Sequence, residues 1–248
     1  MKKVFLFFLL ALISVNALIA LKIFVWHYPL DKLAAKIEYQ VTLTMNAVLH
    51  SNAVNIETAM PLSNSQQKIK NENFNYSGEF TFKTKTSADG SRFGVWRAEK
   101  LNGRHFISYT FYADTKEIIF DIPRNLTIPS AYPQEVAGLM EPSENIQSDN
   151  PDIASLAEKI SAKNKGNAYA IIKDAYNYCL TVIKPADYKG ITDAVTTYRL
   201  GEGSCNGKSR LFAALMRASG IPARLVNGII LNPGAKKTTH VWVELWLN

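Results

Sequence analysis

The sequence predicts an α+β protein. An N-terminal apolar helix is expected to precede a small antiparallel β domain and a domain whose core helix packs on an antiparallel sheet. Residues 4–21 are an apolar run interrupted only by Ser14 and Asn16. Apolar and polar residues then alternate between residues 37 and 120, whereas helical spacing of apolar residues prevails from residue 151. With 248 residues, 47% of them hydrophobic, the chain can form two modest domains.

Residues 1–28 are predicted to be a transmembrane anchor. As a helix, the run of residues 4–21 is ~27 Å long, and its extension to Trp26 crosses a hydrocarbon core of ~30 Å, which leaves Trp26 and Tyr28 at the interface. A cleavable signal peptide is the alternative, but no Ala-x-Ala cleavage site closes the run. We therefore expect contact with the lipid bilayer through residues 4–26, with the rest of the chain outside the cytoplasm.

Residues 29–125 are predicted to form an antiparallel β-sandwich of about six strands. The alternation is clearest where Ile37, Tyr39, Val41, Leu43 and Met45 are separated by polar residues. Asp89-Gly90 and Asn102-Gly103 lie between apolar runs and predict hairpin turns. His50 and His105 have no second ligand at metal spacing, so we interpret both as ordinary surface or core residues.

Residues 126–150 are predicted to be a proline-rich linker, because half of the 10 prolines lie between residues 123 and 151. The domain that follows, residues 151–248, begins with a helix whose start is marked by Asn150 and Pro151. Further helices are expected over residues 167–183 and 192–200. Cys179 lies on an apolar stripe of the first of these, which indicates a buried structural residue.

A candidate nucleophile, Cys205, lies at the start of another predicted helix. Apolar residues at i, i+4 spacing define that helix, which ends at Ser219-Gly220 before Pro222. The free backbone N–H groups of a helix N-terminus favour a thiolate. Nearby glycines at positions 201, 203 and 207 are expected to keep bulk away from the sulfur and to let a substrate approach. We expect both cysteines to be free thiols.

Two strands should follow, over residues 223–231 and from residue 240 onward. In the second strand, Val241, Val243, Leu245 and Leu247 share one face, and His240, Trp242, Glu244 and Trp246 share the other. A thiol at a helix start and an imidazole on a nearby strand are the two groups that papain-like catalysis needs, because the imidazole accepts the thiol proton and later donates it to the leaving group.

Three motifs, in order, resemble the transglutaminase-like superfamily. They are Gly203–Gly207 (Gly-Ser-Cys-Asn-Gly), Arg217–Arg224 and His240–Glu244 (His-Val-Trp-Val-Glu). The resemblance covers about residues 150–248 and implies a papain-like fold in which Cys205 is the nucleophile and His240 the base. The substrate cleft is then expected to include Gly203, Ser204, Gly207 and Trp242.

The family's third catalytic residue, an Asp on the next strand, has no counterpart here, because the sequence ends at Asn248. Either the chain is part of a longer protein or the triad is incomplete. The order of anchor, β domain and transglutaminase-like domain also resembles the N-terminal half of a bacterial family described as inactive transglutaminases fused to seven transmembrane helices. This second resemblance implies an inner-membrane anchor, periplasmic domains and further transmembrane helices beyond residue 248.

The charge pattern indicates no nucleic-acid partner. Lys and Arg (28) exceed Asp and Glu (21) to give a formal charge of +7, spread along the chain without interleaved aromatic residues. We interpret it as a solvated surface that tolerates anionic lipid head groups. Cys-x-x-Cys, His-Glu-x-x-His, P-loop and dinucleotide-binding patterns are absent from the sequence, so no metal or other cofactor is expected.

Two functions therefore stay open. In one, Cys205 attacks an amide carbonyl, His240 protonates the departing amine, and water or another amine takes the acyl group from the thioester. In the other, a weak or inactive relative serves as a binding or scaffolding module for a peptide, protein or envelope ligand. The family description and the missing Asp favour the second.

Overall fold

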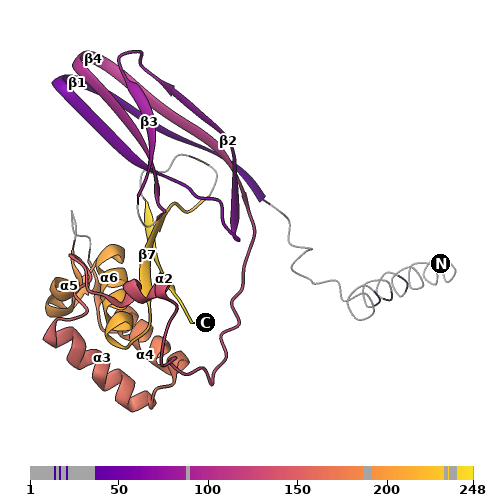
Figure 1. The fold of residues 1–248 in the computed structure, drawn as a ribbon, viewed down its shortest axis with the longest axis vertical. Coiled ribbons are helices and arrows are strands. Elements are labelled where there is room, and N and C mark those ends of the chain that lie inside the picture. Colours follow the sequence, from indigo (N-terminus) through magenta and orange to yellow (C-terminus); the bar gives the residue numbers. More distant parts are fainter. Residues whose placement is uncertain are drawn as a thin grey trace, which may run out of the picture. The chain divides into compact units, whose positions relative to one another are not determined.

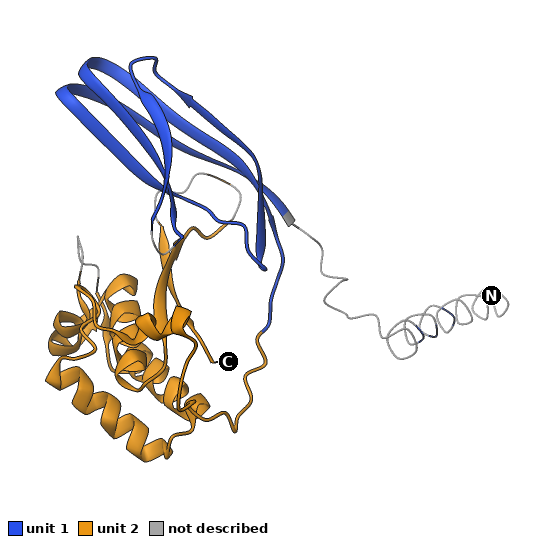
Figure 2. Cartoon of the chain, in the orientation of Figure 1, with its two compact units in different colours: residues 1–119 blue, residues 120–248 orange. Residues whose placement is uncertain are grey.

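The computed structural model describes residues 37–87, 90–186, 192–231, 234 and 239–247, together with Ser14, Ala17 and Leu21. The chain divides into two compact units, residues 1–119 and 120–248 (Figure 2). The predicted anchor lies almost wholly outside the described residues. Within them, no helix combines the length and the apolar content needed to cross a membrane. The predicted mixed α+β class with antiparallel sheets is confirmed.

The first unit contains one four-stranded antiparallel sheet (Figure 1). Its strands are β1 (Ile37–Met60), β2 (Gln67–Tyr76), β3 (Thr81–Thr86) and β4 (Arg92–Thr115). The two 24-residue strands, β1 and β4, pair along their whole length, and β2 and β3 follow each other along the opposite edge of β4. The described residues of this unit thus hold four strands rather than about six, because runs that look separate in the sequence belong to the same long strands.

The hairpin predicted at Asp89-Gly90 joins β3 to β4, which pair antiparallel up to Thr86 and Arg92. Asp89 itself lies outside the described residues. The N–H of Gly90, which has a φ of +82°, donates to the carbonyl of Ser87 at 2.9 Å. The turn predicted at Asn102-Gly103 is wrong, because both residues lie inside β4 and pair with β1. The positive φ of Gly103, +104°, is accommodated within the strand instead.

The paired long strands change their buried face near Asn52 and Lys100, which we call the face switch. In β1 the half-buried side chains are odd-numbered from Tyr39 to Ser51 and even-numbered from Val54 onward. The buried side chains of β4 change parity at the same level. Side chains alternate strictly along a regular strand, so the switch requires an irregular residue, and Lys100 has a φ of +56°.

The face switch lets the two halves of the sheet share apolar contacts. Phe74 of β2 stacks on Phe82 of β3 with ring centroids 4.3 Å apart. Met60, at the end of β1, packs in one cluster with Tyr109 and Phe111 of the other half. The apolar core of this unit therefore lies between the halves of one continuous sheet.

The second unit is organised around the helix α6, Cys205–Ala218. The other longer elements are α3 (Pro151–Asn164), α4 (Ala168–Thr181), α5 (Ala194–Leu200), β7 (Ala223–Gly228) and β8 (His240–Leu245). Short elements are α2 (Gln134–Ala137), η3 (Gly138–Met140), β5 (Lys184–Pro185) and β6 (Glu202–Gly203), the last two paired in parallel. The helix α6 contacts α3, α4 and α5 as well as the antiparallel pair β7–β8.

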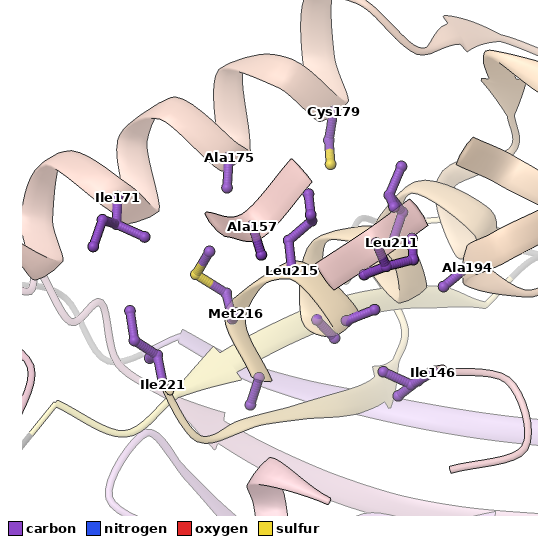
Figure 3. Packing of buried hydrophobic residues seen from close by; sticks show 14 of the residues in the cluster. Ile146, Ala157, Ile171, Ala175, Cys179, Ala194, Leu211, Leu215, Met216 and Ile221 are labelled. Carbon is purple, nitrogen blue, oxygen red and sulfur yellow. The ribbon is translucent and has the colours of Figure 1, made fainter. Parts of the chain in front are cut away.

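The core of this unit surrounds α6, as Figure 3 shows. Ile171, Ala175 and Cys179 lie on one side of α4 and point toward Leu215 and Met216 of α6. Each of these side chains is at most 5% exposed. The predicted burial of Cys179 on the apolar stripe is therefore confirmed.

The proline-rich segment packs on the second unit. Leu126 and Ile128 contact its core, and the hydroxyl of Tyr132 donates to the carbonyl of Gly220 at 2.8 Å. The compact unit accordingly begins at residue 120. Within the linker predicted over residues 126–150, Leu126 and Ile128 are half-buried against that core.

Candidate active site around Cys205

Cys205 is the first residue of α6, as the sequence predicts, and its side chain is exposed. Ser204 is the N-cap: its backbone is extended, and its Oγ accepts a hydrogen bond from the N–H of Gly207 at 3.4 Å. The first turn carries no acidic side chain. The free N–H groups and the positive end of the helix dipole therefore lie beside the thiol without a carboxylate from that turn to offset them.

The two glycines nearest Cys205 pack against Thr197 of α5. This threonine is fully buried, and its Oγ1 donates to the carbonyl of Asp193 at 2.8 Å. A Cβ at Gly207 would lie 2.5 Å from Thr197 Oγ1, and a Cβ at Gly203 would lie 2.9 Å from Thr197 Cγ2. Both glycines are buried, and Thr197 occupies the space that a side chain at either position would need.

Two basic side chains of α6 hold the start of the helix in place. Lys208 Nζ donates to the carbonyl of Ile183, and Arg210 Nη1 donates to the carbonyl of Thr192 at 3.0 Å. Sequence reasoning missed these residues and Thr197, because their roles depend on contacts with segments distant in the sequence. The local signal was the helix predicted over residues 192–200, which precedes the glycines.

His240 opens β8 and lies opposite Gly228 of β7. Its ring meets that of Trp242 edge-on, with centroids 5.0 Å apart. Trp242 is 42% exposed and covers Gly228 so closely that a Cβ there would lie 2.5 Å from its Cζ3. Val243 and Leu245 pack on the core instead, so the predicted alternation of β8 is confirmed.

The groups that catalysis would require make other contacts. Cys205 Sγ lies 3.7 Å from Asn206 Oδ1, and the structure gives no hydrogen bond between Cys205 and His240 among the described residues. Glu244, the carboxylate on the His240 face, accepts from Arg224 Nε at 2.9 Å and Nη2 at 2.7 Å through one oxygen. Cys205 and His240 thus belong to elements that pack together, α6 and β8, but no hydrogen bond joins their side chains.

The described residues contain no cluster of three or more His, Cys, Asp or Glu side chains suited to a metal ion. Cys179 and Cys205 are both free, as predicted, but their surroundings differ. Burial raises the pKa of the Cys179 thiol to about 12, so this thiol stays protonated at neutral pH. Of the two cysteines, only Cys205 is accessible.

Replacing Gly207 with Ala tests the packing that sets the start of α6. Ala has the higher helix propensity by about 1 kcal/mol, yet overpacking against Thr197 should outweigh it and destabilise the unit by a net 1–3 kcal/mol or so. In a Thr197→Ala background the contact is removed, and Gly207→Ala should then be neutral or stabilising. Urea unfolding of the original chain, the two single variants and the double variant measures the free energy that couples residues 197 and 207. If Gly207→Ala lowered the free energy of unfolding equally in both backgrounds, the contact with Thr197 would not be the cause.

Alkylation distinguishes the two thiols. At pH 7, iodoacetamide should modify Cys205 of the native chain at least about tenfold faster than Cys179, since Cys179 is buried and protonated. Peptide mass spectrometry measures both rates, and the guanidinium-unfolded chain, in which both thiols should react, is the control. Equal native rates, or a disulfide between the two, would contradict the structure.

The comparisons with known proteins agree on the fold of this region. The model of the transglutaminase-like superfamily matches residues 154–248. No curated protein matches the chain. The structure of a candidate cysteine protease from Cytophaga hutchinsonii is similar at a TM-score of 0.69 and 21% identity, over 86% of this chain and 74% of that one.

A weaker similarity, at a TM-score of 0.43 and 16% identity, is to the periplasmic domain of TgpA from Pseudomonas aeruginosa bound to ethylmercury, over 86% of this chain and 69% of that one. The first similarity extends beyond the second compact unit and shows a shared fold. The superfamily model covers the elements from α3 to β8, so residues 154–248 are similar to the transglutaminase-like superfamily.

Proposed function

We propose that the transglutaminase-like domain binds a peptide or protein segment with little or no turnover. The proposal is supported by one observation: the side chains that a catalytic triad would join contact other residues instead. The thiol of Cys205 lies by Asn206, the imidazole of His240 lies by Trp242, and the carboxylate of Glu244 binds Arg224. In an active triad the base bonds the nucleophile and a third group orients the base. The described residues provide neither bond.

The outer face of β8 offers a suitable binding surface. Trp242 exposes a large indole beside His240, and Val226 lies opposite it on β7. Exposed Trp side chains often supply much of the energy of protein interfaces, because they bury a large area and lose few rotamers on binding. We therefore place the ligand across Trp242.

Cysteine-dependent acyl transfer is a second candidate, and the exposure of Cys205 at the start of α6 favours it. The thiolate would attack an amide carbonyl to form a tetrahedral intermediate. Its collapse would break the C–N bond, and the amine would leave with a proton from His240. Water or a second amine would then cleave the thioester and return the thiol.

We further propose that residues 4–26 anchor the chain in a bacterial inner membrane and that the units lie in the periplasm. The support is the length of the apolar run and the aromatic residues that follow it.

A fluorescein-labelled peptide containing glutamine tests binding against turnover. We expect its anisotropy to rise with the full chain and the Kd to increase at least about tenfold for Trp242→Ala, which loses the indole contact. Cys205→Ala should bind as the original chain does. Tyr176→Ala, which removes an exposed aromatic side chain from α4, is the matched control and should leave binding unchanged.

Mass spectrometry of the same peptide, with and without a primary amine, follows deamidation, amine incorporation and cleavage. Turnover that disappears in Cys205→Ala would establish the acyl-transfer candidate instead. If no glutamine peptide of a varied set were bound or turned over, both candidate functions would be overturned.

The anchor has its own test. The mature chain should keep its original N-terminus, because an anchor is not cleaved. It should also sediment with membranes after an alkaline carbonate wash, which does not extract a membrane-spanning helix. Intact-mass measurement on the membrane fraction gives the answer. A mature protein that begins between residues 21 and 28 would show that the run is a cleaved signal peptide.

A further inference from the structure

The strand β1 is an edge of the sheet in the first unit, and it lacks the usual protection against pairing. The strand order places β1 beside β4 alone, so its outer edge carries backbone N–H and C=O groups with no strand partner among the described residues. From Tyr39 to Ile56 the sequence contains no Asp, Glu, Lys or Arg and no Pro or Gly. Natural sheets commonly block long edges with such residues, because an open edge pairs with other strands.

The other edge of the same sheet carries that protection. Along β2, Lys68 and Lys70 are followed by a register shift between Lys70 and Asn73, where Asn71 has a φ of +51°. Along β3, Lys83 and Lys85 add charge, and the edge is interrupted between the two strands. Lysines and irregular backbone therefore disfavour pairing at the edge formed by β2 and β3, whereas the edge formed by β1 is uncharged from Tyr39 to Ile56. This difference indicates that β1 has a pairing partner.

We propose that the partner is a second copy of this chain, and that two β1 strands pair antiparallel over residues 38–52 about a two-fold axis at Met45. A two-fold pair is self-complementary, because each contact of one copy is repeated in the other. The resulting eight-stranded sheet would satisfy the open backbone groups of both edges.

The face switch selects this register. Opposed residues of an antiparallel pair lie on the same face, so the two copies must match odd-numbered with odd-numbered side chains. This parity holds only up to Ser51, because the buried side chains are even-numbered from Val54. When the two-fold axis lies at Met45, every residue of β1 from Glu38 to Asn52 has a partner before the face switch. Tyr39 then lies opposite Ser51 of the second copy, and Val41 lies opposite Leu49.

Charge and polarity agree with a second copy as the occupant. On the outer face, Thr44 would oppose Asn46, Thr42 would oppose Val48, and Gln40 would oppose His50 of the second copy. Glu38, the acidic residue at the end of the stretch, would oppose Asn52, so no like charges meet. The strand is thus compatible with itself over the whole paired stretch, residues 38–52.

Sedimentation velocity of the full chain in density-matched detergent tests the proposal. We expect a dimer at about 50 µM, where a complex with a micromolar Kd is mostly associated. Thr44→Lys combined with Asn46→Lys should raise the Kd at least about tenfold, because introduced ammonium groups would face each other at two places. Ala59→Lys, a substitution at a position of β1 that is also exposed but lies beyond the paired stretch, should leave the dimer intact.

Cross-linking gives a readout that does not depend on the stability of the lysine variant. In a Cys205→Ser background, an equimolar mixture of Thr44→Cys and Asn46→Cys chains should form a disulfide-linked pair under mild oxidation faster than either chain alone. A monomeric chain at the concentration above, a dimer unaffected by the paired lysines, or cross-linking that is no faster in the mixture would each overturn the proposal.

Discussion

The arrangement of helices in the second unit depends on the close packing of Thr197 against Gly203 and Gly207. It brings α5 against the first turn of α6 and so fixes where that helix begins. From this start, Leu211 and Leu215 are directed into the core, while Cys205 stays exposed at the first residue of the helix. The position of the thiol is therefore a consequence of helix packing, whether or not the domain catalyses a reaction.

The β unit follows a different physical constraint. Two 24-residue strands cannot bury one continuous face in a small unit, and the face switch at Lys100 resolves this by giving each half its own inward face. The same switch limits how far β1 can match another strand. In each unit a local feature thus determines which side chains are accessible. In the second unit it is the contact of Thr197 with two glycines, and in the first it is the positive φ of Lys100.

Local features of the second unit were predictable from the sequence, because they depend on short-range chemistry. Asn150, Asn167 and Ser204 cap helices with their own side chains, and the alternation of β8 separates His240 and Trp242 from the core. Long-range features were not. Asn102-Gly103 has the composition of a turn, but pairing with β1 keeps it within a strand, and apolar burial holds the proline-rich segment against the domain. The partners of Thr197 and Glu244 likewise appear only in the folded chain.

The transglutaminase-like domain has an accessible Cys205, and we expect its reactivity not to depend on His240. The decisive measurement is the rate of Cys205 alkylation by iodoacetamide at pH 6–7, compared between the original chain and His240→Ala. Without a hydrogen bond between the two side chains, the rates should agree within about threefold. A drop of about tenfold or more in His240→Ala, with unchanged circular dichroism, would show instead that the imidazolium of His240 stabilises the Cys205 thiolate.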